Sequence, residues 1–189
     1  MEKTLSINNL KHRVIKALQD FFLYDKVLID ISSNERSWTH KLAEHLQKQF
    51  PGWDVDCEYN RRGENNKKLI SEYPSIPSPS VSEEEARTVF PDIVVHHRTI
   101  KSNLLVIEIK KSSSHDDGEA DKKKLRCFLM DKNYRYQYGL FLRLGNSGCT
   151  EAKLLLINGN SEQPDEVDWC EDIRNALDVL RSAGSEYSH

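Results

Sequence analysis

The 189-residue sequence lacks long apolar runs, and no stretch approaches the roughly 18 apolar residues that a membrane-spanning helix needs. Glycine and proline are scarce, at 8 and 6 residues, which argues against a fibrous or low-complexity protein. The first nine residues do not show the basic and apolar regions of a signal peptide. We therefore expect a globular, cytoplasmic protein with no membrane partner.

Cysteines are also few and widely spaced. The four of them lie at positions 57, 127, 149 and 170, and neighbours are more than twenty positions apart. This spacing does not favour a zinc site or a disulfide framework, so free thiols are expected. A glycine-rich phosphate loop and a G-x-S-x-G elbow are missing as well, which removes two common enzyme signatures.

Neither sign of charge dominates the composition. Lys and Arg number 27 against 30 Asp and Glu, and a net charge of −3 taken alone argues against a simple basic nucleic-acid binder. The charge is unevenly distributed, because residues 151–189 hold nine acidic and three basic side chains. Residues 1–150 are therefore mildly basic. The acidic segment could shield a site, contact a partner or aid solubility.

Apolar periodicity predicts alternating helices and strands. Helices are expected over roughly 9–23, with an N-cap at Asn8 or Asn9, and over 35–50, 119–131 and 168–182. Strands are expected over 53–59, 91–97, 103–110, 136–143 and 152–157. The run 27–31 is interpreted as an edge strand or a linker, and 60–82 as a long polar loop. This order predicts an α/β fold with a central mixed sheet flanked by helices.

Charged residues occupy two of these strands where the pattern calls for apolar ones. Asp92 opens strand 91–97, while Glu108 and Lys110 share one face of strand 103–110. If the strands pair, the two carboxylates repel each other, which favours a hard cation such as Mg²⁺ with the Ile109 carbonyl as a further ligand. Lys110 could then deprotonate or orient an attacking water. The alternative interpretation is a solvated strand end.

The helix at 35–50 supplies a third acidic candidate. Its apolar stripe is formed by Trp38, Leu42, Ala43, Leu46 and Phe50. The centre of this stripe lies over Glu35, whereas Glu44 falls on the opposite, solvated face. Glu35 is therefore either a carboxylate of the same site or a residue that offsets the helix dipole.

Together these residues resemble the PD-(D/E)XK, or restriction-endonuclease-like, nuclease superfamily. Pro91-Asp92, fifteen intervening residues and then Glu108-Ile109-Lys110 resemble its defining motif, and the element order over 34–144 resembles its αβββαβ core. Longer phrases, such as residues 105–111, are similar to bacterial or phage-related nucleases. We therefore expect a single domain over 1–189, with 1–33 as an N-terminal helical extension, 34–144 as the core, and 145–189 as a C-terminal strand and acidic helix.

The resemblance implies a Mg²⁺-dependent, or Mn²⁺-dependent, nuclease that hydrolyses phosphodiester bonds. Asp92 and Glu108 would bind the metal, Lys110 would assist the attacking water, and Glu35 would reach the metal directly or through water. DNA is favoured over RNA and an endonuclease over an exonuclease, and a homodimer or partner protein would allow both strands to be cut. The alternatives are an RNA-directed nuclease and a catalytically silent module that binds nucleic acid or protein.

Basic side chains near these elements are candidates for phosphate contacts. They are Arg61, Arg62, Lys67, Lys68, Lys111 and Lys124. Lys124 is the candidate that we expect to face the site from helix 119–131. Alternation along the strand turns Lys111 away from Lys110.

Overall fold

The computed structural model describes residues 5–59, 61–62, 65–66, 90–100, 102–132, 134–159, 161 and 163–184. The helices are α1 (Ile7–Tyr24), α2 (Val27–Asp30), α3 (Glu35–Gln49), α4 (Glu119–Met130) and α5 (Cys170–Gly184). The strands are β1 (Asp54–Cys57), β2 (Arg61–Arg62), β3 (Asn65–Asn66), β4 (Ile93–His96), β5 (Asn103–Lys111), β6 (Tyr138–Gly145), β7 (Gly148–Leu156) and β8 (Asp165–Asp168). None of the helices described here has the length and apolar character needed to cross a membrane.

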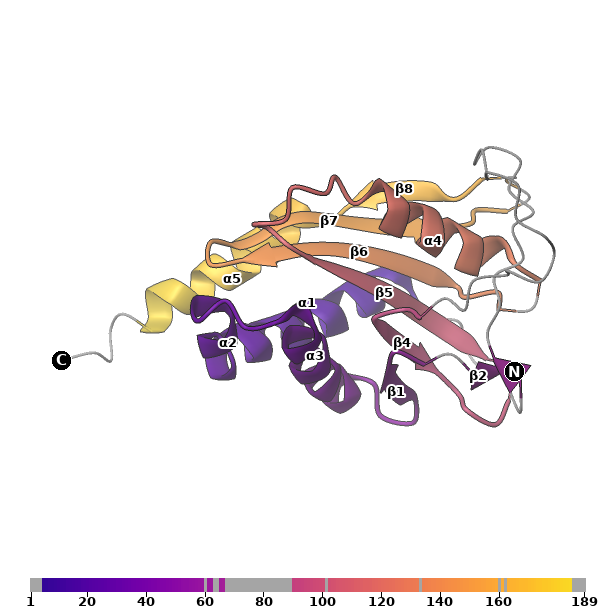
Figure 1. Ribbon diagram of the computed structural model, residues 1–189, viewed down its shortest axis with the longest axis horizontal. Helices are drawn as coiled ribbons and strands as arrows, with labels where there is room; N and C mark the ends of the chain where they lie inside the picture. Colours follow the sequence, from indigo (N-terminus) through magenta and orange to yellow (C-terminus); the bar gives the residue numbers. More distant parts are fainter. Residues whose placement is uncertain are drawn as a thin grey trace.

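One six-stranded mixed sheet forms the centre of the molecule, in the order β1-β4-β5-β6-β7-β8 (Figure 1). β5 and β6 run parallel, and the other neighbouring pairs in this sheet are antiparallel. The parallel pair requires a crossover connection, which α4 supplies. The prediction of an α/β fold with a central mixed sheet flanked by helices is confirmed.

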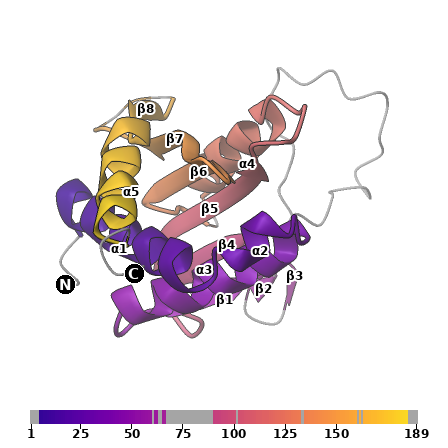
Figure 2. The ribbon, with the colours of Figure 1, turned by 90° about the vertical axis from the view of Figure 1, so that its left-hand side faces the viewer.

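Helices cover both faces of this sheet, and each covered face has its own apolar cluster (Figures 1 and 2). On one face α1, α3 and α5 pack over β5 side chains such as Ile107 and Ile109. On the other face α4 packs over Val106 and its neighbours. Because side chains alternate along a strand, Glu108 and Lys110 point to the same face as Val106, toward α4.

α1 belongs to the main core. Its N-cap is Ser6, whose hydroxyl accepts a hydrogen bond of 3.3 Å from the backbone N–H of Asn9. The prediction of a cap at Asn8 or Asn9 is therefore wrong by two or three residues. Phe21 is fully buried in the cluster that α3 and the sheet share, so the segment 1–33 contributes directly to the core.

Three segments differ from the predicted secondary structure. Residues 27–31 contain the short helix α2, not a strand, and the Trp38 indole N–H donates to the Leu28 carbonyl at 3.1 Å. The segment 60–82 contains the paired strands β2 and β3 within its expected loop. Strand β8 is not predicted from the sequence, because its four residues are all exposed and show no apolar alternation.

Glu58 interrupts the alternation of β1. Its φ of 47° lies in the left-handed region, which reverses the direction of the next side chain. Val55 and Cys57 pack on the α3 side as predicted, but Tyr59 packs on the α4 side, with its ring 4.4 Å from that of His96. The prediction of a single apolar face is wrong at Tyr59.

Candidate active site

The start of β4 and the end of β5 lie side by side because the two strands are antiparallel. Ile93 is opposite Ile107, so one further step in this register places Asp92 beside Glu108. Asp92 Oδ2 also accepts a hydrogen bond of 2.7 Å from the backbone N–H of Ile109. The structure therefore brings together the two carboxylates that the sequence predicts to be neighbours.

Glu108 is a buried carboxylate with only 1% of its surface exposed. Loss of hydration raises its pKa well above the usual range, and the nearby charge of Asp92 raises it further. The Lys124 ammonium opposes both effects, since its Nζ lies 2.5 Å from Glu108 Oε2. The second oxygen, Oε1, is buried without a hydrogen-bond partner among the described residues. Such an atom is costly to bury unless a cation or donor approaches it.

Asp92 shows a smaller effect of the same kind. Burial raises its pKa to about 6, and the hydrogen bond from Ile109 and the charge of Lys124 offset part of this rise. The negative charges of Glu35 and Asp121 add to the rise. Four acidic groups therefore influence one another across this end of the sheet, which is an arrangement that a cation would stabilise.

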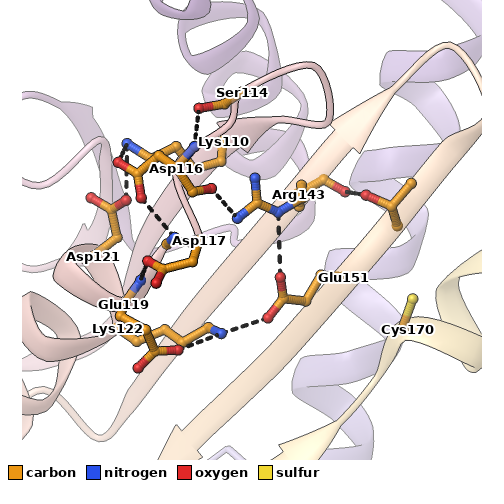
Figure 3. A network of polar contacts seen from close by, with 12 residues as sticks. Lys110, Ser114, Asp116, Asp117, Glu119, Asp121, Lys122, Arg143, Glu151 and Cys170 are labelled. Atoms are coloured by element: carbon orange, nitrogen blue, oxygen red, sulfur yellow. Dashed lines mark hydrogen bonds and ion pairs between the residues drawn. The ribbon is translucent and has the colours of Figure 1, made fainter.

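Lys110 lies on the same face of β5 as Glu108, and Figure 3 shows its contacts with Asp116 and Asp121. Its Nζ is 3.0 Å from Asp121 Oδ2 and 3.6 Å from Asp116 Oδ2. Burial disfavours its charge, but the hydrogen bond to Asp121 and the surrounding carboxylates outweigh this effect and raise its pKa. Lys110 is therefore an ammonium at neutral pH, able to donate hydrogen bonds.

Glu35 reaches the end of β5 from the first turn of α3. The side chain of Asn34 caps this helix by accepting a hydrogen bond of 2.8 Å from the backbone N–H of Ser37. Glu35 Oε2 accepts a hydrogen bond of 3.1 Å from the backbone N–H of Lys111. The helix start thus holds this carboxylate next to Lys110. The opposite-face residue Glu44 is exposed, as predicted.

The other basic residues that the sequence predicts to contact phosphates lie in different parts of the structure. Lys111 lies on the α3 side, where its ammonium donates to the Ser33 carbonyl and sits 4.9 Å from the centre of the Trp38 ring. Arg61 and Arg62 form strand β2, opposite Asn66 and Asn65, and their side chains are not described. Lys67 and Lys68 lie outside the described residues. Nucleic-acid binding by all of these residues stays a prediction.

Helix α4 contributes two residues to the site. Lys124 faces it, as expected from the sequence, and also donates to the Phe90 carbonyl at 3.2 Å. Asp121, the partner of Lys110, was missed by the sequence reasoning. The available signal was helical spacing, since Asp121 precedes Lys124 by three residues and such residues share a helix face.

A neighbouring set of contacts fixes the start of α4 on the sheet (Figure 3). Buried Lys122 places its Nζ 2.6 Å from Glu151 Oε1 of β7, while Arg143 Nε of β6 lies 3.3 Å from the other oxygen of Glu151. Both cations also lie over the Phe141 ring, at 5.1 and 5.6 Å from its centre. These contacts hold in place the helical turn that carries Asp121 and Lys124.

The donor set suits a hard divalent cation, although the residues are not gathered around a ready-made metal position. Across the described residues, no three His, Cys, Asp or Glu side chains form a cluster that could hold a metal ion. Asp92, Glu108 and the predicted Ile109 carbonyl offer the oxygen ligands that Mg²⁺ prefers. The unpartnered Glu108 Oε1 is the atom whose burial such a cation would offset.

Comparison of the chain with protein-family models, with curated proteins and with solved structures gave no match in any of the three. Function must therefore be argued from the geometry of the site itself.

Proposed function

We propose that this protein is a Mg²⁺-dependent nuclease of the PD-(D/E)XK superfamily that hydrolyses phosphodiester bonds of DNA. One observation carries the proposal: Asp92 and Glu108 adjoin each other in a desolvated position, with the Lys110 ammonium on the same face of β5. The element order α3, β1, β4, β5, α4, β6 supports it, because it corresponds to the αβββαβ order of that superfamily's core.

Asp92, Glu108 and the Ile109 carbonyl are the groups that would hold Mg²⁺ or Mn²⁺, with Glu35 reaching it directly or through water. A bound ion would supply positive charge to the phosphate and lower the pKa of a coordinated water. The two carboxylates would contribute affinity for the cation. Burial makes their ionised forms costly, and a cation beside them would offset that cost.

Lys110 orients groups in this proposal and does not abstract a proton. A lysine whose pKa lies above its usual range stays protonated at neutral pH, so it donates hydrogen bonds and cannot act as a base. It would hold the attacking water or a phosphate oxygen and offset the charge that develops there. Asp121, at 3.0 Å, keeps the ammonium in position.

A second candidate function is a catalytically silent module of the same fold that binds nucleic acid or protein. The contact between Lys124 and Glu108 favours it, since a paired lysine can by itself neutralise a buried carboxylate. In that case the charged residues stabilise the fold and do not catalyse a reaction.

A cleavage panel separates the two candidates. The purified protein is incubated with supercoiled plasmid, single-stranded DNA and RNA, each with Mg²⁺, Mn²⁺ or EDTA, beside Asp92→Ala and Lys110→Ala. We expect DNA cutting by the wild type only, and only with a divalent ion. Equal cutting by wild type and variants would indicate a contaminant and contradict the proposal. Cutting of RNA alone would change the substrate class, and no cutting at all would favour the silent module.

A further inference from the structure

Lys124 places its ammonium against the buried carboxylate of Glu108. Its Nζ lies 2.5 Å from Glu108 Oε2 and 3.2 Å from the Phe90 carbonyl oxygen. The Glu108 side chain is 2% exposed, whereas that of Lys124 is 23% exposed. The ammonium therefore enters a buried carboxylate site from its solvent-accessible side.

An ammonium in this position and a divalent cation on the same carboxylate exclude each other. The ammonium on Oε2 and a cation on Oε1 would lie only a few ångströms apart, and two positive ions so close repel strongly where water is scarce. Lys124 thus does for Glu108 what a bound metal ion would do: its ammonium neutralises the carboxylate. A cation that enters must first overcome this ion pair.

We propose that Lys124 is a built-in competitor of the divalent cation, displaced from Glu108 when the cation binds, and that the released ammonium then binds a phosphate of the substrate. The first half concerns cation binding alone, while the second half rests on the proposed nuclease function. Binding of the metal ion would thereby expose a phosphate-binding group, so the metal ion and the nucleic acid would bind cooperatively.

The surrounding structure permits this movement. The backbone of α4 is anchored next to Lys124 by Leu125, which is fully buried, and one turn later by Phe128, also fully buried. The lysine side chain itself is long and flexible, so its charged end can move while the helix stays in place. Lys123, one residue earlier, is exposed and offers a matched control on the same helix.

The test measures Mn²⁺ binding by electron paramagnetic resonance, without a nucleic acid, for the wild type, Lys124→Met and Lys123→Met. Loss of the competing charge should tighten Mn²⁺ binding to Lys124→Met by about tenfold or more, while Lys123→Met should bind within about twofold of the wild type. Mn²⁺ binding by Lys124→Met that is equal to or weaker than that of the wild type would overturn the inference. The absence of Mn²⁺ binding by both the wild type and Lys124→Met would also overturn it.

A second measurement needs no variant and so does not depend on the folding of Lys124→Met. Wild-type protein is acylated with an amine-reactive ester, with and without Mg²⁺, and each lysine is quantified by mass spectrometry. Displacement predicts a several-fold increase in the reactivity of Lys124 on addition of Mg²⁺, with Lys123 as the internal reference. An unchanged or lower reactivity of Lys124 would contradict the proposal.

Failure of the nuclease proposal is distinguishable from failure of this inference. Tighter Mn²⁺ binding by Lys124→Met, together with no cleavage of any nucleic acid by the wild type, would support the role of Lys124 as a competitor of the cation and contradict the nuclease proposal. The phosphate-binding half is tested by the affinity of a DNA oligonucleotide in Ca²⁺. Lys124→Met should lose the stimulation of binding by Ca²⁺, and full retention of that stimulation would reject this half.

Discussion

Asp92 is ionised in the folded protein only at a cost in stability. Burial raises its pKa from an ordinary value of 3.8 to about 6. Between these two values the folded state holds the proton that the unfolded state has already released, so stability falls as pH rises through this window. The full cost is present above about pH 6, where a shift of about two pKa units corresponds to about 3 kcal/mol at most.

Asp92→Asn should therefore stabilise the protein in the absence of divalent ions at pH 8. The amide keeps an oxygen that can accept the hydrogen bond from Ile109, but it carries no charge to desolvate. We expect a gain of about 1–3 kcal/mol in the free energy of unfolding at pH 8, shrinking toward zero near pH 4. Urea denaturation at both pH values measures it.

The matched control is Asp117→Asn, which changes an exposed carboxylate that caps the backbone N–H of Glu119. It should alter stability by less than about 0.5 kcal/mol at either pH. If Asp92→Asn destabilised the protein at pH 8 by as much as at pH 4, desolvation would not be the dominant effect at Asp92.

At the scale of the element, the placement of α4 depends on Gly118. This residue precedes the helix with φ of 79°, and an added Cβ would lie only 2.5 Å from Cζ of Phe141. Gly118→Ala should therefore combine backbone strain with a clash inside the sheet face. We expect a loss of about 2–4 kcal/mol in unfolding free energy, measured by urea denaturation.

Gly52→Ala separates the two effects. Gly52 also has a positive φ, of 87°, but no atom of the described residues lies within 4 Å of its added Cβ, so strain alone should cost about 1 kcal/mol. Equal losses for the two variants would show that the close approach to Phe141 does not position α4.

Periodicity predicted most elements, because residues 9–23, 103–110 and 119–131 carry strong apolar patterns that tertiary packing does not override. Periodicity failed to predict the secondary structure where tertiary packing or backbone conformation determines it. Residues 27–31 are apolar enough for a strand, but burial of Ile29 and the indole hydrogen bond of Trp38 hold them as a helix. The strand β8 carries no apolar pattern, because its four residues are exposed; among the described strands it pairs only with β7.

Strand alternation and strand pairing predict the part of the candidate site that lies on and next to β4 and β5. The sequence predicts that Asp92 and Glu108 meet if strands 91–97 and 103–110 pair, and that Lys124 faces the site from helix 119–131. Asp121 was not found, because its role depends on how α4 crosses the sheet. That crossing is fixed by contacts distant in sequence, such as Lys122 with Glu151.

At the scale of the whole molecule, the first helix and the sheet share one core. Phe21→Ala removes a fully buried ring of α1 and should lower the free energy of unfolding of the entire molecule by about 3–5 kcal/mol. Circular dichroism and tryptophan fluorescence should shift together. Leu23→Ala, on the exposed side of the same helix, should have little effect. Two separate transitions would instead make α1 an independent unit.

The acidic C-terminal segment is partly neutralised by the rest of the chain. Asp172 of α5 lies 2.5 Å from Lys11 of α1, and Glu166 of β8 pairs with Arg126 of α4. The first contact lies on the sheet face that α1 and α5 cover, and the second involves α4, which covers the other face. The acidity that argued against a nucleic-acid partner is thus located in part away from Asp92 and Glu108.

The most direct test of the central claim is the single-turnover rate of Mg²⁺-dependent DNA cleavage by the wild type, Glu108→Gln and Glu44→Gln. Glu108→Gln keeps the shape of a buried side chain but removes its charge, and it should lower the rate by at least about a hundredfold. Glu44→Gln, on the exposed face of α3, should cleave at the wild-type rate. A Glu108→Gln rate equal to that of the wild type would contradict the assignment of this site.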